Sequence, residues 1–164
     1  MGCSLQSVKP SVYIETTIPS YLMARPSRDL IIAANQQITK DWWERRKEHF
    51  NLFISEFVIE EVSAGDKEAA KERLKLLREI PLLDAIPEVG ELAQILLKNK
   101  IIPAKASQDA VHIATAAVHG IDLLMTWNCK HIANATIFAS IRSICEKQGY
   151  DCPEICTPQE LMED

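Results

Sequence analysis

Acidic and amide side chains stand near the ends of the apolar segments of this 164-residue chain. Glu15 closes the run SVYIE, and Asn128 directly follows the run IDLLMTW. Glu60 and Glu61 lie beyond a third apolar run, FNLFIS, and Asp109 opens the segment SQDAVHIATAAVHG. Carboxylates that share one cleft raise each other's pKa unless a cation neutralises them, and oxygen ligands suit Mg²⁺ or Mn²⁺. The set therefore predicts metal-assisted phosphoryl-transfer chemistry, in which the ion activates water.

Each of these residues also has an ordinary explanation. A glutamate at the end of a strand, such as Glu15, is commonly a solvated loop residue. Asp109, close to Ser107, favours a helix N-terminus through capping and the helix dipole. Asn128 suits a turn. Spacing alone leaves both interpretations open.

The elements that must position these residues are short apolar strands alternating with helical segments. We expect strands at 11–15, 50–55, 81–86, 121–127 and, more weakly, 154–158. Helical patterns cover 28–49, 56–62, 66–80, 88–98, 107–119 and 130–147. Apolar strands separated by helices indicate an α/β fold with a parallel sheet covered on both faces. Such sheets bind ligands beyond the carboxyl ends of their strands, which is where the polar residues lie.

The segment 107–119 combines an apolar composition with a polar stripe. His112 lies three residues after Asp109, so the two share a helix face, and Thr115 and His119 continue the stripe. We expect this helix to be buried, with its stripe bordering the cleft at the N-terminal end. His112 could orient a carboxylate or contact substrate, or it could be a hydrogen-bonded packing residue.

Composition places the chain among globular proteins. Hydrophobic residues make up 47% and charged residues 25%, which is ordinary for one soluble domain. The net charge of −5 argues against indiscriminate nucleic-acid binding, but not against an enzyme that holds phosphates through metal ions. No apolar run approaches the roughly 20 residues of a membrane span, and MGCSLQSVKP lacks a signal-peptide core. We therefore expect a cytoplasmic protein with no membrane partner.

The five cysteines are an odd number, and reduced thiols explain them best. A zinc site on Cys152 and Cys156 would lack a second pair of ligands. In the segment DWWERRKEHF, aromatic and basic residues could hold RNA, or one tryptophan could pack in the core beside a solvated basic face. Arg25 and Arg28 follow the first strand and are better candidates for phosphate contact.

Three pieces of the sequence resemble a PIN-domain protein in their order and spacing: VYIETTIPSYL, SEFVIEEV and SQDAVHIATAAVHGIDLLMTWNCKHI. Within that superfamily the chain is most similar to the VapC-type toxin ribonucleases. The resemblance covers residues 10–160 and leaves residues 1–9 as an N-terminal extension. It implies a three-layer α/β/α sandwich with a central parallel sheet of about five strands.

The resemblance also implies site residues, an activity and partners. Matched by position, the four residues of the family's acidic site fall at Glu15, Glu61, Asp109 and Asn128. Glu60 would then face solvent. The implied activity is Mg²⁺- or Mn²⁺-dependent endonucleolytic cleavage of RNA, and the implied partners are a small antitoxin protein and a second copy of the chain. The segment 28–49, with Trp42 and Trp43, is the candidate for burial against such a partner.

Two positions depart from the family pattern, and they leave other functions open. Glu15 and Asn128 stand where aspartate is usual, so the site has three carboxylates instead of four. A ribonuclease toxin is the leading interpretation. The second is a catalytically weak or inactive PIN-like domain that binds RNA or a protein. A different metal-dependent hydrolase, such as a phosphatase, ranks last because it would need a nucleophilic aspartate where the chain has Glu15.

Overall fold

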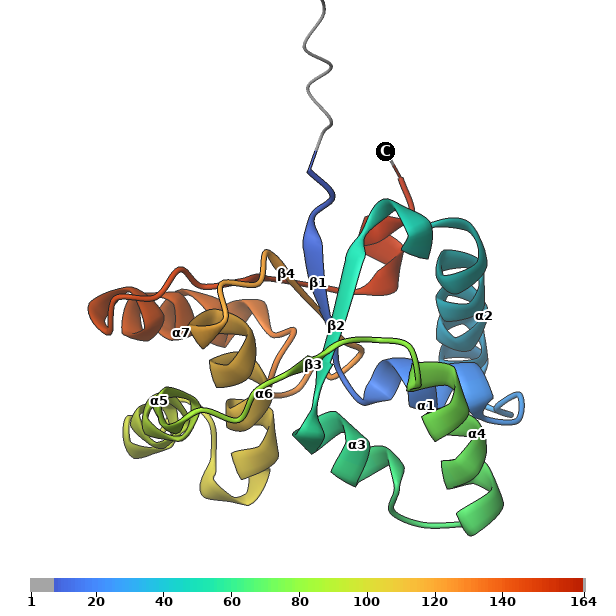
Figure 1. Cartoon of the computed structure of the whole chain (residues 1–164), viewed down its shortest axis with the longest axis horizontal. Coiled ribbons are helices and arrows are strands. Elements are labelled where there is room, and N and C mark those ends of the chain that lie inside the picture. The colour runs from blue at the N-terminus through green and yellow to red at the C-terminus, as the bar shows by residue number, and fades with distance from the viewer. Residues whose placement is uncertain (1–7, 164) are drawn as a thin grey trace, which may run out of the picture.

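Five short parallel strands form the middle layer of the molecule, as Figure 1 shows for the computed structural model, which describes residues 8–163. The strands are β1 (Ser11–Ile14), β2 (Asn51–Ser55), β3 (Leu82–Leu83), β4 (Leu123–Met125) and β5 (Glu154–Cys156). Their order in the sheet is β3-β2-β1-β4-β5, and every neighbouring pair is parallel. Because β1 is central, Val12, Tyr13 and Ile14 are buried.

Helices cover both faces of the sheet. On one side lie α1 (Thr17–Met23), α2 (Leu30–Arg45), α3 (Glu56–Val62) and α4 (Lys67–Leu77), and on the other α5 (Pro87–Lys98), α6 (Ser107–Val118) and α7 (Ala135–Lys147), as Figure 1 shows. Short 3-10 turns are η1 (Lys47–His49), η2 (Ala104–Ala106) and η3 (Pro158–Leu161). The predicted three-layer α/β/α arrangement is confirmed.

Helix α1 was not predicted, because the segment Thr-Thr-Ile-Pro was interpreted as a turn. Pro19 is the third residue of the helix. Proline is tolerated there because the first N–H groups of a helix have no intrahelical partner. Burial of Ile18 and Leu22 then holds the helix against the core. The turn prediction was therefore wrong, and a helix follows the first strand directly.

Two other elements are shorter than expected. The third strand has two residues instead of 81–86, because Pro87 starts α5 after a short bend in which Ile86 N donates to Asp84 O. The helix expected at 130–147 begins at Ala135. A turn precedes it, and the Asn134 side chain caps the helix by accepting from Thr136 N.

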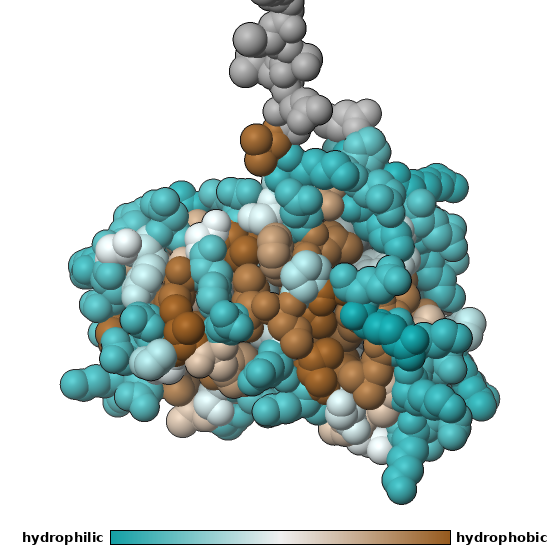
Figure 2. Space-filling model, viewed as in Figure 1, coloured by the Kyte–Doolittle hydropathy of each residue, from teal (hydrophilic) through white to brown (hydrophobic). Residues whose placement is uncertain are grey.

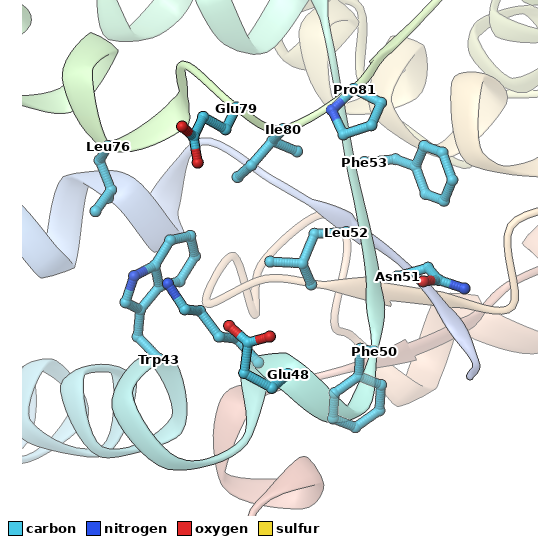
Figure 3. A pocket seen from close by; sticks show the side chains of 11 residues that line it. Trp43, Glu48, Phe50, Asn51, Leu52, Phe53, Leu76, Glu79, Ile80 and Pro81 are labelled. Atoms are coloured by element: carbon cyan, nitrogen blue, oxygen red, sulfur yellow. The ribbon is translucent and has the colours of Figure 1, made fainter.

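The two tryptophans of α2 have different environments. Trp42 is fully buried in the core, so it cannot meet a partner, and that part of the partner expectation was wrong. Trp43 lines an open groove of about 350 Å³ at the amino end of β2, with the Lys47 ammonium 4.9 Å from its ring centroid. Figure 3 shows Trp43, Leu52 and Ile80 pointing into this groove. Apolar side chains gather on the same face in Figure 2, over β2 and β3. The groove lies at the end of the sheet opposite to the predicted acidic site.

No helix within residues 8–163 is both long and apolar enough to cross a bilayer. The predicted N-terminal extension, residues 1–9, lies almost wholly outside the described residues.

Candidate active site

Glu15 follows β1 at the carboxyl edge of the sheet and is only 3% exposed. Its Oε2 atom accepts hydrogen bonds from Thr17 N (3.0 Å), Thr17 Oγ1 (2.5 Å) and Thr126 Oγ1 (2.7 Å). One carboxylate oxygen therefore joins the first turn of α1 to the loop that follows β4. Its other oxygen, Oε1, accepts no hydrogen bond from the described residues, so it is available to another ligand.

Glu61 lies on α3, where its side chain is 24% exposed. Its Oε1 atom accepts hydrogen bonds from His112 Nε2 and from Thr16 Oγ1, the latter at 3.1 Å. Burial raises the pKa of this carboxyl, but the hydrogen bonds from His112 and Thr16 bring the pKa below its usual 4.5. Glu61 is thus held as a carboxylate. Glu60 is exposed to solvent, as expected.

Asp109 occupies the first turn of α6, close to the Asn128 side chain. Burial raises the pKa of Asp109 above its usual 3.8, although the neighbouring Asn128 side chain opposes this shift. The negative charge of Glu61 contributes to the rise, so the two carboxylates are close enough to repel each other.

Thr126 connects two of the predicted residues, Glu15 and Asn128. Asn128 N donates to Thr126 Oγ1 at 2.9 Å, and Thr126 Oγ1 donates to Glu15 Oε2. The Asn128 Oδ1 atom accepts from His131 N at 3.1 Å, which fixes the amide orientation. Glu15 and Thr126 are 111 positions apart in the chain, so only the parallel pairing of β1 with β4 brings them together.

The polar stripe of α6 borders the site for one turn only. His112 is fully buried and reaches Glu61. Thr115 is buried and bonds to Val111 O of its own helix, and His119 bonds to Asp84 O. The stripe was expected to border the cleft at its N-terminal end, and an open hollow of about 530 Å³ lies there, beside Asp109.

The oxygen donors of these side chains can be compared with the ligands that a divalent metal ion prefers. Within residues 8–163, no three Asp, Glu, His or Cys side chains are already converged as a metal cage, which also leaves the zinc alternative without support. Mg²⁺, however, usually keeps several waters and uses only one or two carboxylates directly. The oxygen donors of Glu15, Glu61 and Asp109 fit such a hydrated ion.

Sequence reasoning missed several polar residues that support the acids. Thr16 and Thr17 bind Glu61 and Glu15 respectively. Tyr13 lies two residues before Glu15, and a strand places residues i and i+2 on the same face. This spacing could have indicated that Tyr13 lies on the same side of the sheet as the acidic site. Lys105 lines the hollow beside Asp109.

A family model for the PIN domain matches residues 12–132, which is more than half of the chain. The chain belongs to the PIN-domain family. The matched range contains all four predicted site residues. PIN domains are generally nucleases, and they typically use divalent metals.

A solved structure supports the PIN-domain fold. The VapBC2 complex from Rickettsia felis, bound to a DNA fragment from their promoter, is similar to this PIN-domain protein with a TM-score of 0.58. The match covers 90% of this chain and 98% of that one, at 18% sequence identity, so it speaks for the fold alone. Among curated proteins, none matches this sequence significantly.

Proposed function

We propose that this protein is a Mg²⁺- or Mn²⁺-dependent endoribonuclease. The observation that carries the proposal is that Glu15, Glu61 and Asp109 all stand near the carboxyl edge of a PIN-domain sheet. When bound, a divalent ion supplies an activated water and neutralises charge on the phosphodiester. The three carboxylates would hold that ion. Asn128 completes the site beside the Asp109 carboxylate.

Basic side chains near the acids would hold the RNA backbone. Lys105 lies in the hollow beside Asp109, where an ammonium group suits a phosphate. Arg25 and Arg28 are exposed just beyond α1 and keep their proposed role in phosphate contact. These few local cations act in a chain whose net charge is −5, so we expect weak binding to nucleic acid in general and binding at this edge in particular.

We further propose that the protein is the toxin of a toxin–antitoxin pair and that it forms a homodimer. The solved structure that is similar to it in fold is VapBC2 bound to a promoter DNA fragment. The partner segment 28–49 retains a suitable surface, because Leu30 and Ile31 at the start of α2 are 85% and 74% exposed. Large apolar side chains exposed together mark protein interaction sites. The neighbouring open reading frame would show whether a small antitoxin accompanies the chain, and we expect the protein to act in the cytoplasm.

The test of the activity is cleavage of a panel of single-stranded RNAs with Mn²⁺, with EDTA as the metal-free control. Asp109→Asn and Glu61→Gln should each lower the cleavage rate by orders of magnitude, because each removes a carboxylate from the ion. Glu60→Gln is the matched control, since Glu60 is the exposed neighbour of Glu61 on the same helix. It should cleave like the wild type.

Two results would contradict the proposal. Cleavage that persists in EDTA, or that survives both carboxamide substitutions, would show a contaminant or another mechanism. A wild type that binds RNA without cutting any member of the panel would establish the alternative, a PIN-like binding domain without catalysis.

A further inference from the structure

A chain of buried hydrogen bonds ends on Glu61. The Tyr13 hydroxyl lies 2.7 Å from Ser55 Oγ and 2.6 Å from His112 Nδ1, and His112 Nε2 bonds to Glu61 Oε1. Tyr13 and His112 are fully buried, and Ser55 is 1% exposed. The four residues come from β1, the end of β2, α3 and α6. This series of hydrogen bonds therefore connects the sheet to helices on both of its faces.

We assign the direction of each hydrogen bond for a His112 ring that carries a single hydrogen. The Glu61 carboxylate can only accept, so His112 Nε2 carries a hydrogen. Ser55 Oγ already accepts from Val58 N, and its own hydrogen points to Tyr13. The Tyr13 hydroxyl then donates to His112 Nδ1, which is the unprotonated nitrogen. With this arrangement every donor in the series of hydrogen bonds has an acceptor.

Burial of His112 limits what it can do. Both ring nitrogens are engaged and the side chain is inaccessible to solvent, so it cannot take a proton from a water or contact RNA. Its remaining effect is on Glu61, whose Oε1 it fixes. Asp109 stands one turn earlier on the same helix, so α6 supplies one acid and holds another.

We propose that Tyr13 and His112 are positioning residues, which hold Glu61 in the orientation that receives the divalent ion. The proposal rests on the proposed function for the identity of the ion. Side chains that orient metal ligands in this way typically contribute about 10- to 100-fold to metal affinity. His112 acts on Glu61 directly, and Tyr13 acts by fixing the ring orientation and tautomer of His112.

The first measurement needs no metal. Nitrogen-15 NMR of the imidazole in the metal-free wild type should show His112 with its hydrogen on Nε2 and none on Nδ1. In Tyr13→Phe the Nδ1 atom loses its donor, so its resonance should shift. A hydrogen found on Nδ1 in the wild type would overturn the proposed hydrogen bond from Tyr13 to His112, whatever the activity of the protein.

The second measurement is Mn²⁺ affinity by calorimetry. His112→Ala and Tyr13→Phe should bind Mn²⁺ about tenfold more weakly than the wild type. His112→Gln should restore most of the affinity, because its amide can donate to Glu61 where Nε2 did. His119→Gln is the matched control at the C-cap of the same helix, and it should bind like the wild type.

The outcomes separate this proposal from the proposed function. Equal Mn²⁺ affinities in the wild type, Tyr13→Phe and His112→Ala would overturn the positioning role while leaving a metal-dependent nuclease intact. Failure of His112→Gln to recover affinity would overturn donation to Glu61. A wild type that binds no Mn²⁺ and cuts no RNA would refute the proposed function, and the positioning role would fall with it. If His112→Ala does not fold, the Mn²⁺ affinity of Tyr13→Phe and the His112 tautomer seen by NMR still test the positioning role.

Discussion

The Asn128 side chain lies close enough to the Asp109 carboxylate to lower its pKa, at the position where the family usually has an aspartate. The amide thereby partly offsets the pKa rise of a half-buried carboxylate, a rise to which the charge of Glu61 contributes. An aspartate at position 128 could not donate and would add a further negative charge beside Asp109. The departure from the family pattern therefore suits the metal-free state of the site.

Asn128→Asp should make the protein depend more strongly on metal. Without a divalent ion the melting temperature should fall, because two carboxylates would face each other. Millimolar Mn²⁺ should then raise it by more than in the wild type, and cleavage activity should be kept or raised. Asn134→Asp is the matched control, since Asn134 carries the same side chain at a helix cap outside the acidic site. An Mn²⁺ shift equal in Asn128→Asp and the wild type would contradict this account.

Asp109→Asn should stabilise the metal-free protein while reducing its response to metal. The pKa of Asp109 is raised, so the folded state binds its proton more tightly than the unfolded state does. Stability contributed by this group is present at low pH and is lost as pH rises above the usual value of 3.8. At neutral pH in EDTA, Asp109→Asn should therefore melt at or above the wild-type temperature. Thermal melts with and without Mn²⁺ check both parts, and a large loss of stability in EDTA would contradict the first.

Lys105→Ala should weaken RNA binding more than it slows the chemical step. Lys105 lines the hollow beside Asp109 but belongs to η2, outside the network that holds the acids. We expect KM to rise several-fold at low salt with kcat little changed, and the difference to shrink as salt increases. Lys71→Ala on α4 is the control for removing a positive charge elsewhere. Equal KM values for Lys105→Ala and the wild type would remove Lys105 from the RNA path.

The homodimer should depend on the start of α2. Replacing both Leu30 and Ile31 with glutamate should weaken self-association at least tenfold, because two exposed apolar side chains would become charged. Light scattering at tens of micromolar measures the change. Leu82→Glu is the matched control at another exposed leucine, and loss of the dimer there instead would place the interface at β3. A wild type that is strictly monomeric would contradict the proposal.

The sequence by itself determined the order of the elements and the edge of the sheet where polar residues gather. Apolar runs and helical periodicity are local patterns, so they predicted the five strands and six of the seven helices. The parallel sheet followed from their alternation. The rule that ligands bind at the carboxyl ends of parallel strands then selected Glu15, Asp109 and Asn128 before any contact was known.

Only the tertiary structure decided which groups touch. The bond from Tyr13 to His112 joins residues 99 positions apart, and the one from His112 to Glu61 spans 51. Helix α1 likewise depends on the hydrogen bond from Thr17 N to the Glu15 carboxylate and on burial of its apolar side chains. Neither interaction can be predicted from the local sequence, which resembles a turn. Hydrogen-bond partners and the pKa shifts they cause act over a few ångströms. They therefore exist only once the chain has folded and excluded water from the groups that make them.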